Sequence, residues 1–117
     1  MTIYGIKTCG SVKKAMKFFK DRDIEYDFFD FKKEQVSSEK IDYWLTQVEL
    51  KKLFNKQGTK YRTLKLKELN LDDDGLKEWL SKENMLIKRP VIEYGDIDNP
   101  KVIVAFDEEV YKEIFGN

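Results

Sequence analysis

Histidine is absent from this chain of 117 residues, and cysteine occurs once, at Cys9. The lack of imidazole excludes Cys-His and Ser-His catalysis and every metal site that needs a histidine ligand. A single cysteine also excludes an internal disulfide and a C-x-x-C redox pair. We therefore expect no metal site and a chemistry that uses at most one thiol.

Long apolar runs and an excess of charge are also missing. No run approaches the roughly 20 apolar residues that span a bilayer, and no signal-peptide pattern begins the chain. Basic and acidic residues number 22 each, so the formal net charge of zero provides no global attraction to nucleic acid or to an anionic membrane. Together with the single cysteine, these features predict a soluble, cytoplasmic protein without a direct nucleic-acid or membrane partner.

Apolar and aromatic residues are well represented. They make up 41% and 14% of the chain, which is the composition of a folded domain. A chain of this length buries a core without disulfides or metals. Because no repeat, low-complexity tract or linker interrupts it, we predict a single domain over residues 1–117.

The first part of the chain has the pattern of a β-α-β unit. Residues 2–6 and 24–31 are predicted strands, and apolar residues recur between them at helical spacing from Val12 to Phe19. Two strands joined in this way lie parallel, with a right-handed crossover. Ser11 is a candidate cap for the helix or a hydrogen-bond donor to Cys9, and the N-cap preference of serine favours the first role.

A helical block over about residues 37–84 and a β-β-α unit complete the chain. Pro90 opens a strand at residues 91–94, and residues 101–106 are predicted to pair with it as an antiparallel hairpin. The expected fold class is α/β, with a mixed sheet covered by helices. The final helix is expected to direct three apolar residues toward the core: Val110, Ile114 and Phe115.

Cys9 lies where the first strand pattern gives way to the first helix pattern. Backbone N–H groups and the dipole at a helix N-terminus stabilise a thiolate and can lower a cysteine pKa from roughly 8.5 to about 3.5–7.5. A free cysteine is otherwise often a small buried hydrophobe. Here the neighbours form a polar turn, which favours a reactive thiol: Lys7, Thr8, Gly10 and Ser11.

The element order, with a cysteine after the first strand and a proline at the start of the third, resembles the thioredoxin fold. In that fold the proline is typically cis and lies beside the thiol, where the backbone before it receives an extended thiol substrate. The resemblance implies a thioredoxin-like mixed sheet in which Pro90 lies near Cys9.

Five segments carry a more specific resemblance: residues 3–9, 12–15, 53–59, 88–92 and 104–106. They are similar to the arsenate reductase (ArsC/Spx) family, and most of all to its small branch of uncharacterised thiol-reductase-like proteins. The resemblance covers nearly the whole chain and implies that Cys9 is the reactive cysteine. It also implies that Arg89 binds an oxyanion and stabilises the thiolate. A guanidinium suits both roles because it stays charged and offers several donors in a fixed fork.

Two positions depart from the arsenate-reducing pattern. Asn55 stands where an arginine is expected in the helical block, and Ala105 or Phe106 stands where a further arginine is expected before the last helix. The chain contains only Arg22, Arg62 and Arg89. An oxyanion pocket lined by three guanidinium groups cannot be assembled at matching positions, which argues against arsenate as the substrate.

A run of basic residues between positions 51 and 67 contains no acidic residue. Such a run is ordinarily a solvated face, but it can also form a basic rim that attracts a glutathione carboxylate or an acidic partner. The candidate residues for binding the substrate or the thiol are Gly10, Ser11, Asn55, Lys56, Thr59 and Pro90.

The leading functional hypothesis is a thiol-dependent oxidoreductase with Cys9 as its sole redox thiol. Val12 occupies the position of a resolving cysteine, so an external thiol such as glutathione must release Cys9 from a mixed disulfide, and no cofactor is bound. The Spx branch leaves a second hypothesis open, in which the chain is a regulatory protein that docks on RNA polymerase. A third is a family member without catalytic activity.

Overall fold

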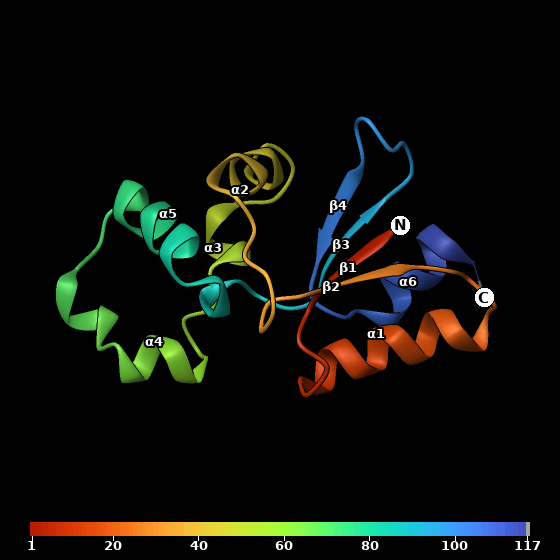
Figure 1. Cartoon of the computed structure of the whole chain (residues 1–117), viewed down its shortest axis with the longest axis horizontal. Helices are drawn as coiled ribbons and strands as arrows, with labels where there is room; N and C mark the ends of the chain where they lie inside the picture. Colours follow the sequence, from red (N-terminus) through yellow and green to blue (C-terminus); the bar gives the residue numbers. More distant parts are fainter. Residues whose placement is uncertain (117) are drawn as a thin grey trace.

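The computed structural model describes residues 1–116 and contains one mixed four-stranded sheet (Figure 1). Strand β1 (Thr2–Gly5) pairs in parallel with β2 (Asp27–Asp30) and antiparallel with β3 (Val91–Tyr94), and β3 pairs antiparallel with β4 (Lys101–Val104). The strand order is β2-β1-β3-β4. This is the predicted mixed sheet, with a parallel first pair and a terminal hairpin.

Two helices belong to the β-α-β and β-β-α units, and the others form the central block. Helix α1 (Gly10–Asp21) follows β1, and α6 (Glu108–Phe115) follows β4. Figure 1 shows the central helices gathered on the side of the sheet away from α1 and α6. The block contains α2 (Ser38–Leu45), α3 (Leu50–Leu53), α4 (Thr59–Thr63), η1 (Leu66–Leu69), α5 (Asp73–Lys82) and η2 (Asn84–Leu86).

The sheet separates two apolar clusters because side chains alternate along each strand. Ile3 and Ile92 belong to the cluster that includes the buried face of α1 and Tyr111 of α6. Tyr4 and Val91 belong to the larger cluster that includes the central helices. Both faces of the sheet are therefore covered. None of the helices in residues 1–116 has the length and apolar character needed to cross a bilayer.

Gly5 allows α1 to lie close to β1. A Cβ atom at this position would be 2.6 Å from Cγ2 of Val12, which is well inside the contact distance of two carbon atoms. Val12 is fully buried in the first turn of α1. The contact sets the height of that turn above the sheet, and Cys9 is the residue at which the turn starts.

A buried carboxylate joins the sheet to α2. Glu93 of β3 is only 6% exposed and accepts hydrogen bonds from the Tyr4 hydroxyl (2.7 Å) and the Trp44 indole N–H (2.8 Å). Lys40 forms an ion pair with the same carboxylate at 3.1 Å. Because each oxygen has a donor, the charge is tolerated in the interior. The predicted strand was correct here, but the sequence pattern did not indicate that Glu93 is buried.

The prediction for the start of α1 is wrong. Cys9, not Ser11, is the N-cap residue, and Ser11 is exposed within the first turn. The Cys9 backbone is extended, and its carbonyl oxygen accepts the first helical hydrogen bond from Lys13 N–H (3.0 Å). The helix therefore begins two residues earlier than the serine preference suggested.

Two further details at the C-terminal end differ from the prediction. Strand β4 ends at Val104 and does not extend to Phe106, because Ala105 adopts a left-handed conformation with φ of 72°. In α6, Val110 is 36% exposed and Tyr111 is 1% exposed, so Tyr111 takes the core position expected for Val110. The Tyr111 ring packs against Phe18 and Phe19 of α1.

Candidate functional site

Cys9 lies half-buried at the N-terminus of α1 and forms no disulfide. Its backbone N–H donates to the Ile6 carbonyl oxygen at 3.2 Å, so a tight turn connects the end of β1 to the helix. The Cys9 side chain lies at the start of α1, where the N–H groups of the first turn have no acceptor within the helix. The sulfur therefore remains available to the unpaired N–H groups of the first turn, which favour a negative charge.

The surroundings of Cys9 act on its pKa in opposite directions. Partial burial raises the pKa, but hydrogen bonds from the Val12 backbone, the Arg89 side chain and the Ser11 backbone lower it. The positive charge of Arg89 lowers it further. The combined effect places the Cys9 pKa below the ordinary value of a cysteine thiol, which increases the fraction of thiolate near neutral pH.

Arg89 is brought to the thiol by the loop that precedes β3. The Arg89–Pro90 peptide bond is cis. The Nη1 atom of Arg89 donates to the Met85 carbonyl oxygen at 3.0 Å, which holds one edge of the guanidinium. The Nε atom is buried and has no acceptor among residues 1–116. A buried donor without an acceptor is costly, so a thiolate or another anion beside Arg89 would be stabilised.

The same loop is attached to the helical block by a short antiparallel pairing. Lys88 N–H donates to the Leu53 carbonyl oxygen at 2.7 Å, and Asn55 N–H donates to the Leu86 carbonyl oxygen at 2.8 Å. Phe54 and Ile87 form the bridge between these bonds. The residues that follow α3 and the residues that lead to Arg89 therefore lie side by side.

Asn55 and Lys56 lie in a pocket next to this pairing. The pocket has a volume of about 520 Å³ and reaches from the end of α3 to the residues between β4 and α6. The Asn55 side chain also organises its own turn, because its Oδ1 atom accepts a hydrogen bond from Gln57 N–H at 3.1 Å.

The remaining predicted binding residues differ in their surroundings. Gly10 and Ser11 are exposed beside Cys9, and a Cβ atom on Gly10 would have open space around it. Pro90 is buried, and its carbonyl oxygen accepts from Ala105 N–H at 2.8 Å. Thr59 is exposed at the start of α4, and within residues 1–116 no side-chain hydrogen bond links it to Cys9 or Arg89.

Arg22 and Arg62 are not placed to complete an oxyanion pocket. Arg22 caps the far end of α1, where its guanidinium donates to carbonyl oxygens of Phe18 and Gly116. Arg62 is exposed on α4. In residues 1–116, no group of three or more Cys, Asp or Glu side chains is arranged to hold a metal ion.

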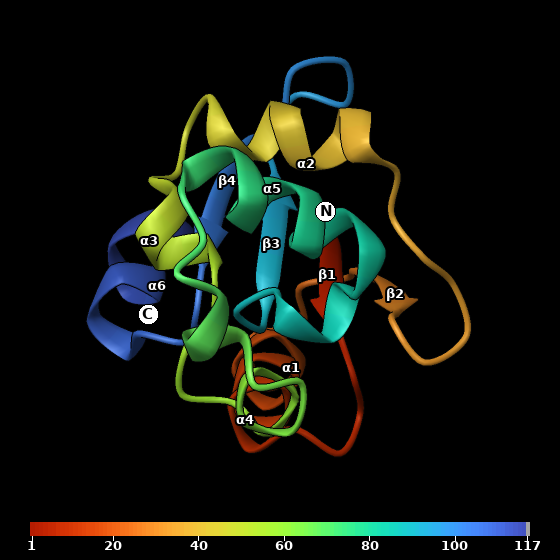
Figure 2. The same ribbon diagram turned by 90° about the vertical axis from the view of Figure 1, so that its left-hand side faces the viewer.

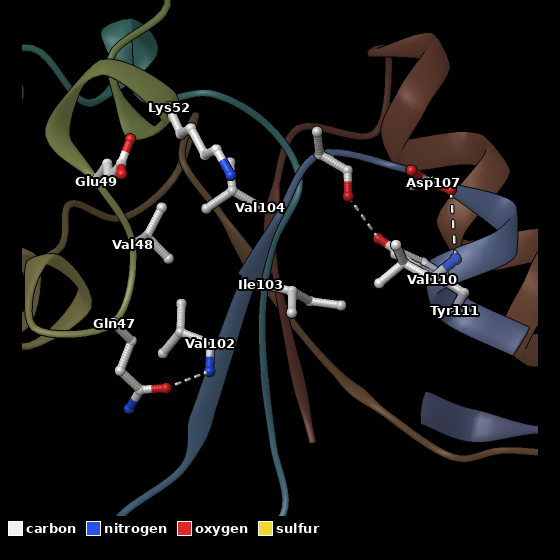
Figure 3. A pocket seen from close by; sticks show the side chains of 11 residues that line it. Gln47, Val48, Glu49, Lys52, Val102, Ile103, Val104, Asp107, Val110 and Tyr111 are labelled. Atoms are coloured by element: carbon white, nitrogen blue, oxygen red, sulfur yellow. Dashed lines mark hydrogen bonds between the residues drawn. The ribbon is translucent and has the colours of Figure 1, made fainter. Parts of the chain in front are cut away.

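A second pocket follows the outer edge of β4 (Figure 3), and neither this pocket nor the one beside Asn55 is lined by Cys9 or Arg89. It has a volume of about 460 Å³. The Gln47 side chain covers part of this strand edge, with its Oε1 atom accepting from Val102 N–H at 2.9 Å and its Nε2 atom donating to the Pro100 carbonyl oxygen at 2.8 Å. The two residues predicted to carry the thiol chemistry therefore lie outside this pocket.

Sequence reasoning missed two residues at the site. Met85 holds Arg89 in place through its backbone, and a backbone carbonyl leaves no signature in a sequence. Lys88 lines the same pocket as Asn55 and Lys56. Its position directly before Arg89 was the available signal.

Comparison with known proteins gives a consistent result across almost the whole chain. Residues 4–114 match the sequence model of the ArsC family. The uncharacterized protein YusI of Bacillus subtilis (strain 168) is 34% identical over 117 residues, which covers 97% of this chain and 96% of YusI.

Two solved structures show the same fold. A protein named YffB superimposes with a TM-score of 0.84 at 29% identity, covering 96% of each chain. An arsenate reductase (ArsC) related protein from Brucella melitensis superimposes with a TM-score of 0.72 at 36% identity, covering 99% of this chain and 94% of the other. The similarity confirms the predicted thioredoxin-like fold class.

Proposed function

Because this chain belongs to the ArsC family, we propose that it is a thiol-dependent reductase in which Cys9 is the nucleophile and Arg89 stabilises its thiolate. One observation carries the proposal: Cys9 lies at the N-terminus of α1, and the side chain of Arg89, from a distant loop, is among the groups that lower its pKa. Both features favour a nucleophilic sulfur.

The reaction is a thiol–disulfide exchange with an external thiol. The Cys9 thiolate attacks the glutathione sulfur of a mixed disulfide R–S–S–G, which forms Cys9–S–S–G and releases R–S⁻. R–S⁻ takes up a proton from water. The thiolate of a second glutathione then attacks the glutathione sulfur of Cys9–S–S–G, forms G–S–S–G and restores the Cys9 thiolate. The sum is R–S–S–G plus G–SH giving R–SH plus G–S–S–G, so the substrate is reduced and glutathione is oxidised.

The chain itself requires an external thiol. Val12 follows Cys9 by three residues and is fully buried, and the sequence contains no second cysteine. The proposed partners are glutathione or a comparable thiol and an oxidised thiol substrate, with no bound cofactor. Such a cycle suits the reducing environment of the cytoplasm, which is where we propose that the protein works.

Arsenate is not the proposed substrate. Asn55 stands in place of one arginine of the arsenate-reducing pattern and Ala105 or Phe106 in place of another, and all three line one pocket with Lys88. Neutral side chains there leave Arg89 as the guanidinium beside the thiol. An arsenate anion would lack the donors needed to offset its charge.

Mass spectrometry after incubation with glutathione disulfide tests the proposal. Wild-type protein is expected to gain one glutathione on Cys9 and to lose it when reduced glutathione is added, whereas Cys9→Ser gains none. Steady-state reduction of a glutathionylated peptide should likewise disappear in Cys9→Ser. A wild-type protein that forms no adduct, or that reacts no faster than an unstructured cysteine peptide, would contradict the proposal.

The RNA polymerase hypothesis is the alternative from another class of protein, and it rests on the family resemblance alone. A pull-down of RNA polymerase from cell extract separates the two. Recovery of the polymerase by both wild type and Cys9→Ser, together with no turnover of disulfides, would favour a regulatory protein over a reductase.

A further inference from the structure

The pocket beside Asn55 is lined by four lysines: Lys51, Lys52, Lys56 and Lys88. We call this set the lysine pocket. Lys51 and Lys52 come from α3, Lys56 from the following turn and Lys88 from the loop that leads to Arg89. The pairing of residues 53–55 with residues 86–88 brings these separate segments together.

The lysine pocket has an excess of positive charge. Within residues 1–116, no carboxylate lies within ion-pair distance of Lys52, Lys56 or Lys88, and Lys51 has only an exposed contact of 3.6 Å with Glu49. Asp107 is the acidic residue in the lining. Its Oδ1 atom accepts from the N–H groups of Glu109 and Val110, so it also caps α6.

Two charged side chains that line the lysine pocket lie on opposite sides of the end of β4. Figure 3 shows the Lys52 side chain extending toward Val104 at the end of β4, with Asp107 on the far side of the strand end. Val104, Ala105 and Phe106 form the uncharged lining between them. Clustered ammonium groups around such a lining raise the local concentration of anions.

The lysine pocket is connected to the proposed reaction centre through the chain. Lys88 precedes Arg89 directly, and the backbone N–H of Lys88 is fixed by Leu53. A ligand with carboxylates in the pocket and a sulfur at Cys9 would span both groups. Each surface lysine attracts an anionic ligand only weakly, but the attractions of several lysines add up.

We propose that the lysine pocket selects disulfide and thiol substrates that carry carboxylates, with Lys52 and Lys88 as the specificity-determining residues. The inference rests on the proposed function and concerns only which substrates Cys9 accepts. The exchange itself is unchanged, with the Cys9 sulfur forming the new S–S bond and a thiolate leaving. Neutral and cationic disulfides of similar reactivity are disfavoured.

The test is the single-turnover rate of Cys9 modification by three disulfides of different charge. Glutathione disulfide is anionic, bis(2-hydroxyethyl) disulfide is neutral and cystamine is cationic. Each rate is divided by that of a free cysteine peptide, which removes differences in intrinsic reactivity. The wild type is expected to favour glutathione disulfide over the neutral disulfide by roughly tenfold at low salt, and to lose most of this preference at high salt.

Variants assign the preference to the lysine pocket. In Lys52→Gln/Lys88→Gln, the ratio of the glutathione disulfide rate to the neutral disulfide rate should fall by about the factor by which the wild type favours glutathione disulfide. Lys32→Gln/Lys33→Gln is the matched control, because it removes the same charge from the exposed segment after β2, at the opposite edge of the sheet from β4. Its ratio should remain that of the wild type.

Other outcomes separate the two proposals. Equal normalised rates for all three disulfides, or an equal loss of preference in both double variants, would overturn the lysine pocket while leaving Cys9 as a reactive thiol. A Cys9 that reacts no faster than the peptide with any disulfide would overturn the proposed function and this inference together.

Discussion

Cys9 and Glu93 are two acidic groups whose charged forms the fold stabilises in the same way. Burial opposes ionisation in both, and hydrogen bonds outweigh it. For Cys9 the donors are backbone N–H groups and Arg89, and for Glu93 they are Trp44, Tyr4 and Lys40. The first group lies half-buried beside open solvent, where a charged sulfur can react, and the second lies in the core, where a charged carboxylate stabilises the fold.

Glu93→Gln tests whether the buried carboxylate of Glu93 stabilises the folded protein. Hydrogen bonds hold the Glu93 pKa below its ordinary value of 4.5 in the folded protein. The resulting stabilisation is therefore present above that value and is lost as the pH falls through the lower folded pKa. The glutamine side chain has an NH₂ group in place of one carboxylate oxygen, and this group cannot accept a hydrogen bond from the surrounding donors. The free energy of unfolding at neutral pH should therefore fall by about 1–3 kcal/mol.

Urea denaturation at neutral pH and at several values below 4.5 measures this effect. The variant should lose less stability than the wild type on acidification, since it has no carboxylate to protonate at this position. Glu34→Gln is the control, because Glu34 is exposed and forms no ion pair within residues 1–116. Parallel pH profiles for wild type and Glu93→Gln would contradict the account.

At the scale of elements, the contact between β1 and α1 positions the thiol. Gly5→Ala should lower the free energy of unfolding by about 1–3 kcal/mol, because the new methyl group would overlap Val12. The first turn of α1 would have to move, so alkylation of Cys9 near neutral pH should also slow. Urea denaturation and the rate of iodoacetamide modification provide the two measurements.

A double-mutant cycle tests whether contact with Val12 causes the loss of stability in Gly5→Ala. Val12→Ala alone should cost about 2 kcal/mol through the cavity it leaves, and Gly5→Ala/Val12→Ala should cost less than the sum of the single changes. Gly10→Ala is the control for adding a methyl group, because a Cβ atom there meets nothing within 4 Å. Strict additivity of the Gly5 and Val12 changes would show that the contact does not set the helix position.

The elements themselves could be predicted from the sequence, but several of their ends could not. Apolar periodicity located the helices and strands because it reflects which face is buried. The N-cap at Cys9 and the end of β4 before Ala105 depend on backbone conformation, which a residue preference describes only on average. Val110 and Tyr111 are adjacent in one helix turn, and the apolar pattern did not predict that Tyr111 is the buried residue and Val110 the exposed one.

At the scale of the whole molecule, the candidate site joins segments that are far apart in the chain. The family resemblance suggested that Cys9 and Arg89 belong together, and in the folded chain Arg89 contributes to the lowered pKa of Cys9. The lysine pocket was only partly visible in the sequence. The basic run drew attention to Lys51, Lys52 and Lys56, but their proximity to Lys88 depends on the pairing of residues 53–55 with residues 86–88.

The arrangement of the sheet explains why the two parts meet. Strands β1 and β3 are neighbours, so the turn after β1 and the loop before β3 lie at the same end of the antiparallel pair. Figure 2 shows β1 beside β3, with the central helices in front of the sheet. Cys9 and Arg89 are delivered by these two connections, and the central block holds the second one in place.

The pKa of Cys9 in wild type, Arg89→Ala and Arg62→Ala is the most direct test of the central claim that Arg89 stabilises a thiolate at the start of α1. Ultraviolet absorbance of the thiolate and the pH dependence of alkylation both report it. We predict a pKa below the ordinary value in wild type and in Arg62→Ala, and a higher pKa in Arg89→Ala, with alkylation near neutral pH slowed by roughly three- to tenfold. An ordinary thiol pKa in the wild type, or the same lowered pKa in wild type and Arg89→Ala, would contradict the account.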